Sequence, residues 1–166
     1  GAIEASGHKV LTLPHHEGKV VAGDVEHFIT EFYSDETYQH MVAPGMLYIS
    51  QPTEYGTLYS LRELEALSAT CHKHNIPLYI DGARMAYGLK AEGADFTLKD
   101  IARLADVFYI GGTKIGALFG EALVLVNPEK FDDHFRYMIK RQCAFLAKGR
   151  LIPVQLKALF EGGDDS

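Results

Sequence analysis

Short runs of apolar residues alternate with segments of helical periodicity along this chain, and this alternation restricts the possible folds most strongly. Five runs are short enough to be buried strands: Lys9–Leu13, Met46–Ile49, Leu78–Ile80, Val107–Ile110 and Ala122–Val126. Helical segments are expected at Gly23–His40, Leu61–His74, Ala83–Glu92, Leu98–Ala105 and in a long helix from Pro128. Strands that alternate with helices form sheets with right-handed crossovers. The sequence therefore predicts one α/β domain, with a mostly parallel sheet and flanking helices.

Two of the expected helices begin with the sequence signature of a capping box. Ser60 is followed three residues later by Glu63, and Thr97 is followed by Asp100 at the same spacing. In a capping box the first side chain accepts from a free backbone N–H, and the second reaches back to the cap. Asp24 is the expected N-cap of the first long helical segment.

Charge and cysteine content exclude several classes of protein. The 166 residues include 16 basic and 22 acidic side chains, which gives a formal net charge of −6. Binding to nucleic acid or to an anionic membrane needs a basic surface, so neither partner is expected. No apolar run approaches the roughly 20 residues of a membrane span. Cys71 and Cys143 are too few for a disulfide framework and indicate reduced thiols in a cytoplasmic protein.

Three loops that follow expected strands carry the side chains best suited to chemistry. They are Ser50–Thr57, Asp81–Arg84 and Gly111–Lys114. Ligands of open α/β sheets bind beyond the carboxyl ends of the strands, so Asp81, Arg84 and Lys114 are expected to meet at one edge. Pyridoxal phosphate needs a lysine for its resting Schiff base and an acid that keeps its pyridine nitrogen protonated. Residues of these types also occur at strand ends as helix caps and solvated charges, so spacing alone leaves a structural role open.

Longer stretches of the sequence resemble a known family. Residues 1–10, 49–61, 77–84 and 109–121 are similar to the threonine aldolase and aromatic-amino-acid β-eliminating lyase family. The combination of Asp81-Gly-Ala-Arg84 with Gly111-Gly-Thr-Lys114 is the most specific part of this resemblance. The resemblance implies the aspartate-aminotransferase-type fold of pyridoxal-phosphate enzymes. It is stronger to the low-specificity threonine aldolases than to tryptophanase or tyrosine phenol-lyase.

The resemblance also assigns roles to individual residues. It implies that Lys114 forms the Schiff base with pyridoxal 5′-phosphate and that Asp81 is the partner of the pyridine nitrogen. Arg84 would lie beside the phenolic oxygen of the cofactor, and Thr113 would contact its phosphate or another of its groups. Related lyases place an asparagine near the cofactor oxygen in the loop where this chain has Thr53-Glu-Tyr-Gly56, so that contact is not expected here.

The same resemblance predicts the extent of the domain. Residues 1–166 are expected to be a partial pyridoxal-phosphate-binding large domain, without the N-terminal segment and the C-terminal small domain of the family. The missing parts carry the phosphate cup, the ring that stacks on the cofactor and part of the carboxylate clamp. The isolated chain is therefore expected to have little or no activity.

The expected reaction is aldol cleavage of a threonine-like β-hydroxy-α-amino acid to glycine and an aldehyde. The partners implied are a small amino-acid substrate and further copies of the same chain in a homo-oligomer. One alternative is β-elimination of an aromatic amino acid by the same machinery. Another is a non-catalytic fragment that binds a partner and has inherited the motifs from an ancestral enzyme without their function. No residue is identified as the base for the β-hydroxyl proton.

Other motifs of catalytic sites are absent. His15-His16-Glu17 lies in an expected turn and lacks the His-Glu-x-x-His spacing, so no metal site is expected. The order of residues in Gly111–Lys114 does not match a phosphate-binding P-loop. The sequence also lacks the Gly-x-Gly-x-x-Gly fingerprint of dinucleotide binding and the Gly-x-Ser-x-Gly elbow of serine hydrolases.

Overall fold

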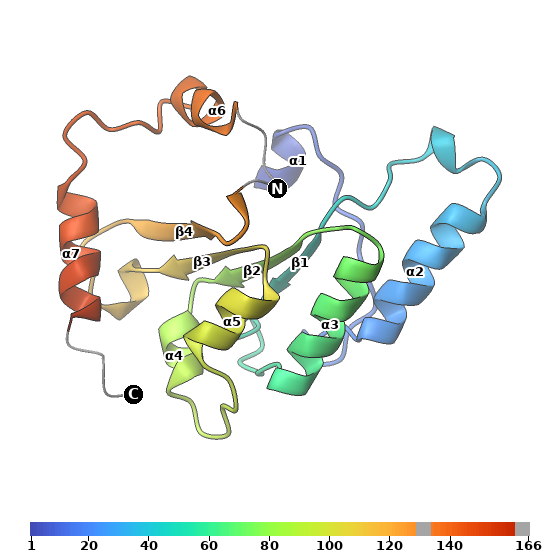
Figure 1. Ribbon diagram of the computed structural model, residues 1–166, viewed down its shortest axis with the longest axis horizontal. Helices are drawn as coiled ribbons and strands as arrows, with labels where there is room; N and C mark the ends of the chain where they lie inside the picture. Colours follow the sequence, from blue (N-terminus) through green and yellow to red (C-terminus); the bar gives the residue numbers. More distant parts are fainter. Residues whose placement is uncertain (129–133, 162–166) are drawn as a thin grey trace.

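The computed structural model describes residues 1–128 and 134–161 (Figure 1). Its strands are β1 (Leu47–Ser50), β2 (Leu78–Gly82), β3 (Val107–Gly111) and β4 (Glu121–Leu125). Its helices are α1 (Ala2–Ala5), α2 (Ala22–Ser34), α3 (Leu61–Lys73), α4 (Met85–Leu89), α5 (Leu98–Leu104), α6 (Phe135–Arg141) and α7 (Leu151–Phe160). Two 3₁₀ turns are η1 (Tyr38–His40) and η2 (Thr113–Ile115). No helix in these ranges is both long and apolar enough to span a membrane.

The strands form one sheet in the order β1-β2-β3-β4. The first three strands are parallel, and β4 is antiparallel to β3. Parallel neighbours need a long crossover, which α3 provides between β1 and β2, and α4 with α5 between β2 and β3. Only the short segment 112–120 joins β3 to β4, so the chain returns in the opposite direction. The predicted α/β class, with a mostly parallel sheet and flanking helices, is confirmed.

One face of this sheet forms the hydrophobic core. Its buried side chains are Leu47, Ile49, Leu78, Ile80, Phe108 and Ile110. Helices α2, α3 and α5 lie along this face (Figure 1) and cover it with Val25, Ile29, Leu64, Leu67, Ile101 and Leu104. Each fully buried aliphatic side chain contributes roughly 1.5–3 kcal/mol to the free energy of folding. This apolar layer fixes the strands and hence the positions where the loops leave them.

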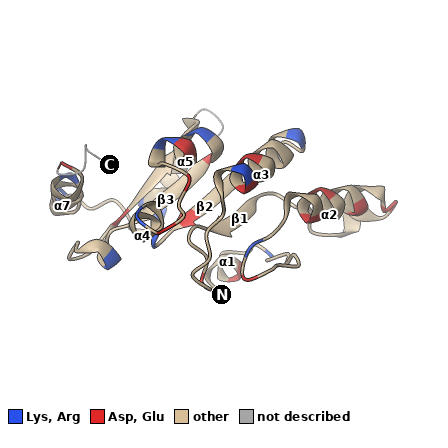
Figure 2. Cartoon of the chain, turned by 90° about the horizontal axis from the view of Figure 1, so that it is seen from below, with Lys and Arg blue, Asp and Glu red and all other residues tan. Residues whose placement is uncertain are grey.

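The other face of the sheet is half-exposed and carries aromatic rings. Residues paired across neighbouring strands point to the same face, so the register places Tyr48 beside Tyr79 and Asp81 beside Tyr109. Charged residues lie on the helices and in the loops (Figure 2), and within the four strands only Asp81 and Glu121 are charged. A lone carboxylate in an otherwise apolar strand needs a polar partner. The positions of Asp81 and Glu121 therefore indicate a specific structural or functional role for each side chain.

The predicted strand Lys9–Leu13 is wrong. This segment has no ladder partner among the described residues, and the nearest pairing is an isolated bridge between His16 and Lys19. The alternating apolar pattern arises because Leu11 and Leu13 turn toward the protein and are half-buried, while their neighbours are exposed. The segment runs along the edge of the core instead of joining the sheet.

The first long helix also differs from the prediction for Gly23–His40. Val21 is its N-cap and provides no side-chain hydrogen bond, whereas Asp24 lies inside the first turn. A carboxylate there still interacts favourably with the helix dipole. At the other end, Asp35 accepts hydrogen bonds from the backbone N–H and the hydroxyl of Thr37, both at 2.7 Å. This local turn ends the helix earlier than the apolar spacing suggested.

Both predicted capping boxes are present, at the starts of α3 and α5. The predicted helix Ala83–Glu92 is shorter, because α4 covers only its middle. The start of the predicted long helix after Pro128 falls on residues 129–133, outside the described residues. Its described part, α6, stops before Cys143, which has a left-handed φ of 56°. Helix α7 was not predicted.

Replacing Leu67 by alanine should lower the free energy of unfolding by about 2–5 kcal/mol, because Leu67 is 1% exposed and its removal leaves a cavity. Leu123→Ala is the matched control on the open face of the sheet, where the leucine is 51% exposed, and should cost about 1 kcal/mol or less. Urea unfolding followed by circular dichroism measures both. Equal losses from the two variants would contradict the assignment of the buried face.

Candidate active site

The carboxyl ends of β2 and β3 lie backbone to backbone, and two glycines make this approach possible. A Cβ atom on Gly111 would lie 2.5 Å from the carbonyl oxygen of Ala83, and one on Gly82 would overlap the carbonyl oxygen of Tyr109. Only glycine fits at such positions without moving the backbone. The loop that follows Asp81 therefore lies directly against the start of the loop that bears Lys114.

Asp81 stands on the half-exposed face at the end of β2 and is held from several sides. Its Oδ1 accepts a hydrogen bond from the backbone N–H of Ala83 at 2.9 Å. Its Oδ2 accepts from the hydroxyl of Tyr48, and the hydroxyl of Tyr109 on the next strand also hydrogen-bonds to the carboxylate. The Tyr48 ring stacks on Tyr79, with ring centroids 5.0 Å apart and planes 9° from parallel. The orientation of the carboxylate is thus fixed by the sheet itself.

The tyrosines around Asp81 have perturbed acidities. Burial, followed by the hydrogen bond to Asp81 and its negative charge, raises the pKa of Tyr48 and of Tyr109 well above the usual value near 10. Burial, followed by the charge of Asp81, also raises the pKa of Tyr79. These hydroxyls therefore remain protonated donors toward the carboxylate far into the alkaline range.

Lys114 lies in η2, in the turn that joins β3 to β4. The backbone N–H groups of Ile115 and Ala117 both donate to the carbonyl of Gly112 at 3.1 Å, which closes the turn. The hydroxyl of Tyr87 in α4 donates to the Lys114 carbonyl at 2.6 Å. The Lys114 side chain is exposed, and its amine makes no hydrogen bond or ion pair with the described part of the chain. The backbone of this residue is fixed while its amine is available.

Arg84 and Thr113 each have a carboxylate partner. Arg84 Nη1 lies 2.9 Å from Glu54 Oε1 in the loop after β1, and both side chains are exposed to solvent. The Thr113 hydroxyl donates to Glu121 Oε1 at 3.1 Å. The loop after β2 thus contacts the loop after β1 through Arg84 and Glu54, and it contacts the loop after β3 where Ala83 lies against Gly111.

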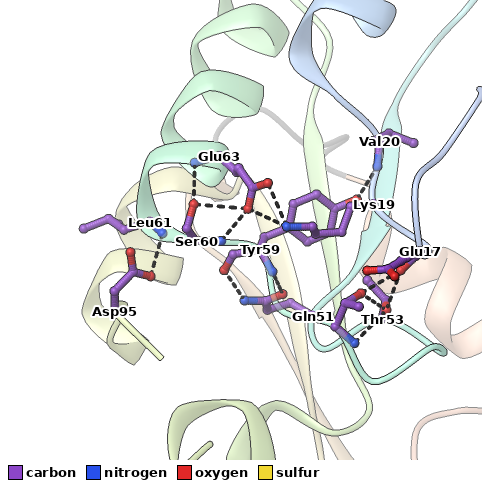
Figure 3. A network of polar contacts seen from close by, with 11 residues as sticks. Glu17, Lys19, Val20, Gln51, Thr53, Tyr59, Ser60, Leu61, Glu63 and Asp95 are labelled. Atoms are coloured by element: carbon purple, nitrogen blue, oxygen red, sulfur yellow. Dashed lines mark hydrogen bonds and ion pairs between the residues drawn. The ribbon is translucent and has the colours of Figure 1, made fainter. Parts of the chain in front are cut away.

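The loop that carries Glu54 is held by a polar network (Figure 3). The side-chain amide of Gln51 forms two hydrogen bonds of 2.9 Å with the backbone of Tyr59, so the two ends of the loop are tied together. The Thr53 hydroxyl lies 2.6 Å from that of Thr57. This network gives the loop after β1 a defined shape before any ligand binds, which lowers the entropy lost on binding.

Described residues form two surface cavities. The larger has about 710 Å³ and is lined by residues between 144 and 153. The other has about 500 Å³ and lies between α2 and the segments around Lys9 and His40. Asp81 and Lys114 line neither of them. The half-exposed surface at the carboxyl ends of β2 and β3 is called the ledge. No group of three or more metal-ligating side chains occurs among residues 1–128 and 134–161.

Several residues of this ledge were not found from the sequence. Tyr48 and Tyr109 were interpreted only as parts of strands, and Tyr87 only as part of a helix. Glu121 was quoted in the family resemblance without a role. A usable signal existed for Glu121, because it is a charged residue at the start of an apolar strand. The tyrosines give no such signal, since aromatic residues are common in strands.

Comparison with known proteins shows the family to which the chain belongs. Residues 1–151 match the family model described as beta-eliminating lyase. A Pseudomonas low specificity L-threonine aldolase is 32% identical over 162 residues, which cover 96% of this chain and 44% of that protein. A Pseudomonas aeruginosa protein of the same name is 34% identical over 113 residues, 68% of this chain and 32% of its own length.

A solved structure of Leishmania major threonine aldolase superposes with a TM-score of 0.88 at 46% identity and covers 97% of this chain and 46% of that one. The fold is therefore that of the matching part of this threonine aldolase. The chain belongs to the beta-eliminating lyase family, and these three relatives are named threonine aldolases. It spans less than half the length of each of the three relatives.

Asp81→Asn should lower the pKa of Tyr48 and Tyr109, because it removes a negative charge that disfavours the phenolate form. Tyrosine labelled with ¹³C at Cζ would show more phenolate at both residues at about pH 11. Tyr59 is the internal control, since burial rather than Asp81 raises its pKa. An unchanged phenolate fraction at Tyr48 would contradict the hydrogen bonding described for Asp81.

Proposed function

We propose that this chain is part of a pyridoxal-phosphate-dependent carbon–carbon lyase that cleaves threonine-like β-hydroxy-α-amino acids to glycine and an aldehyde. The observation that carries the proposal is the junction of β2 and β3. There, a lysine whose amine has no partner in the described residues lies in a loop packed against the loop that follows Asp81. Membership of the beta-eliminating lyase family and the similarity to threonine aldolases support this reaction.

The donor set suits pyridoxal 5′-phosphate. Lys114 offers a primary amine for the aldehyde carbon of the cofactor, and Asp81 offers a carboxylate for its pyridine nitrogen. Gly82 and Gly111 leave no side chain between the two loops, so a planar ring could approach the backbone closely. When bound, the cofactor supplies an electron sink for the carbon from which the aldehyde departs.

The residues of the chain would prepare this chemistry in three ways. The Tyr48 and Tyr109 hydroxyls orient the Asp81 carboxylate, which holds a proton on the pyridine nitrogen when the cofactor is present. Lys114 Nζ, which has no competing partner in the described residues, would hold the cofactor through its aldehyde carbon. Arg84 is proposed to bind the phenolic oxygen. Thr113 is proposed to contact the phosphate or another group of the cofactor without its hydroxyl hydrogen, which Glu121 holds. Because Arg84 is paired with Glu54, its contact with the cofactor requires an exchange of partner.

We further propose that residues 1–166 are the middle of a large domain. The relatives are more than twice as long as the matched region. The family resemblance implies that the phosphate cup, the stacking ring and part of the carboxylate clamp lie outside it. The complete protein would act on a small amino-acid substrate, as a homo-oligomer in the cytoplasm.

Incubating the chain with pyridoxal 5′-phosphate and reducing it with borohydride should attach the cofactor mainly to Lys114. Lys114→Ala should remove most of the label, because the amine that has no partner in the described residues is then lost. Lys99→Ala, at an exposed lysine of α5, is the matched control and should leave the label in place. Peptide mass spectrometry locates the adduct. Labelling spread evenly over the lysines would contradict the assignment of Lys114.

The 166-residue chain alone should release little glycine from threonine or allo-threonine, even with saturating cofactor. The reason is orientation: the bond that breaks must be held perpendicular to the cofactor ring, and the clamp that does this is assigned to other segments. Extending the chain to the length of its relatives should restore turnover. Glycine release at roughly 1 s⁻¹ by the short chain would contradict the proposed division of the domain. Release of pyruvate from aromatic amino acids by the long form would favour β-elimination instead.

A further inference from the structure

Glu121 directs both oxygens of its carboxylate to the turn that carries Lys114. Oε2 accepts a hydrogen bond from the backbone N–H of Gly112 at 2.7 Å, and Oε1 accepts from the Thr113 hydroxyl at 3.1 Å. Glu121 is paired with Gly111 in the β3–β4 register, so it stands directly beside the residues that it binds. A single side chain thus fastens the two residues that precede the lysine.

These hydrogen bonds satisfy a need created by the shape of the turn. Gly112 is the N-cap of η2, and no side chain of the turn itself caps this short helix. A hydrogen bond from a backbone N–H to an ionised carboxylate is stronger than one between neutral groups. The two ends of the turn also approach closely, since a Cβ atom on Gly112 would lie 2.5 Å from the carbonyl oxygen of Gly120. Glu121 therefore binds the turn where its two ends, at Gly112 and Gly120, lie closest together.

Other parts of the fold bind the remaining backbone of the turn. Tyr87 binds the Lys114 carbonyl, and Gln155 of α7 accepts from the backbone N–H of Leu118 and donates to the carbonyl of Phe119. Helix α7 lies beside the turn (Figure 1). Every one of these contacts goes to backbone or to Thr113, and none goes to the amine of Lys114. This pattern fits a turn built to present one side chain.

We propose that Glu121 is a positioning residue for Lys114. By holding the Gly112 N–H and the Thr113 hydroxyl, it fixes the backbone from which the lysine side chain extends toward the cofactor. The role rests on the proposed function, since it assumes that Lys114 forms the covalent link. It requires no contact between Glu121 and either cofactor or substrate.

The test compares Glu121→Gln with Glu121→Ala in the same chain. Glutamine keeps the geometry, because its carbonyl can accept from Gly112 and its amide group can donate to the Thr113 oxygen. Alanine removes both hydrogen bonds. Glu65→Ala is the control, since Glu65 is an exposed carboxylate of α3 paired with Arg103, away from the turn. Circular dichroism checks that each variant is folded.

Two readouts separate positioning from general stability. The first is the ratio of borohydride-fixed pyridoxal 5′-phosphate on Lys114 to that on Lys99 in the same molecules. We expect Glu121→Ala to lower this ratio about tenfold and Glu121→Gln to change it less than about threefold, in line with the loss of a charge-assisted hydrogen bond. The second is hydrogen exchange at the Gly112 amide, which should accelerate in Glu121→Ala alone.

The outcomes are distinguishable from a failure of the proposed function. If the unaltered chain shows no preference for Lys114, the proposed function fails and the role of Glu121 fails with it. If the unaltered chain prefers Lys114 and Glu121→Ala keeps the same ratio, only the positioning role is overturned. A loss in Glu121→Gln as large as in Glu121→Ala would also overturn it, because the hydrogen-bond geometry would then not be the cause.

Discussion

The close backbone approach between the ends of β2 and β3 is the constraint on which the candidate site depends. Gly82 and Gly111 allow it, because a side chain at either position would collide with the neighbouring backbone. The apolar face of the sheet, covered by α2, α3 and α5, supplies the stability that holds the strands in this register. From that junction, Asp81 leaves one strand, and the turn that bears Lys114 leaves the next. Site geometry is thus a direct result of strand packing.

Much of the fold could be predicted because local and long-range preferences agree. The capping boxes at Ser60 and Thr97 form as predicted, since both partners of each lie within one turn of helix. The four strands of the sheet were predicted to within one or two residues, because each is a short apolar run between turn residues. The order of the loops at one sheet edge then follows from parallel topology.

The features missed are those set by partners distant in sequence. Lys9–Leu13 has the composition of a strand, but no ladder partner lies beside it in the described residues. The hydrogen bonds of Tyr48 and Tyr109 to Asp81 depend on strand register, which no local pattern reveals. Glu121 and Tyr87 bind the lysine turn from β4 and α4. The sequence predicts which residues carry the chemistry, whereas the structure shows how their positions are maintained.

The central claim is that Lys114 and Asp81 serve one cofactor. A crystal structure of the chain after borohydride reduction with pyridoxal 5′-phosphate tests this claim most directly. The expected result is continuous density from Lys114 Nζ to the cofactor, with the pyridine nitrogen within hydrogen-bond distance of the Asp81 carboxylate. Density that joins the cofactor to another lysine, or a pyridine ring turned away from Asp81, would contradict it.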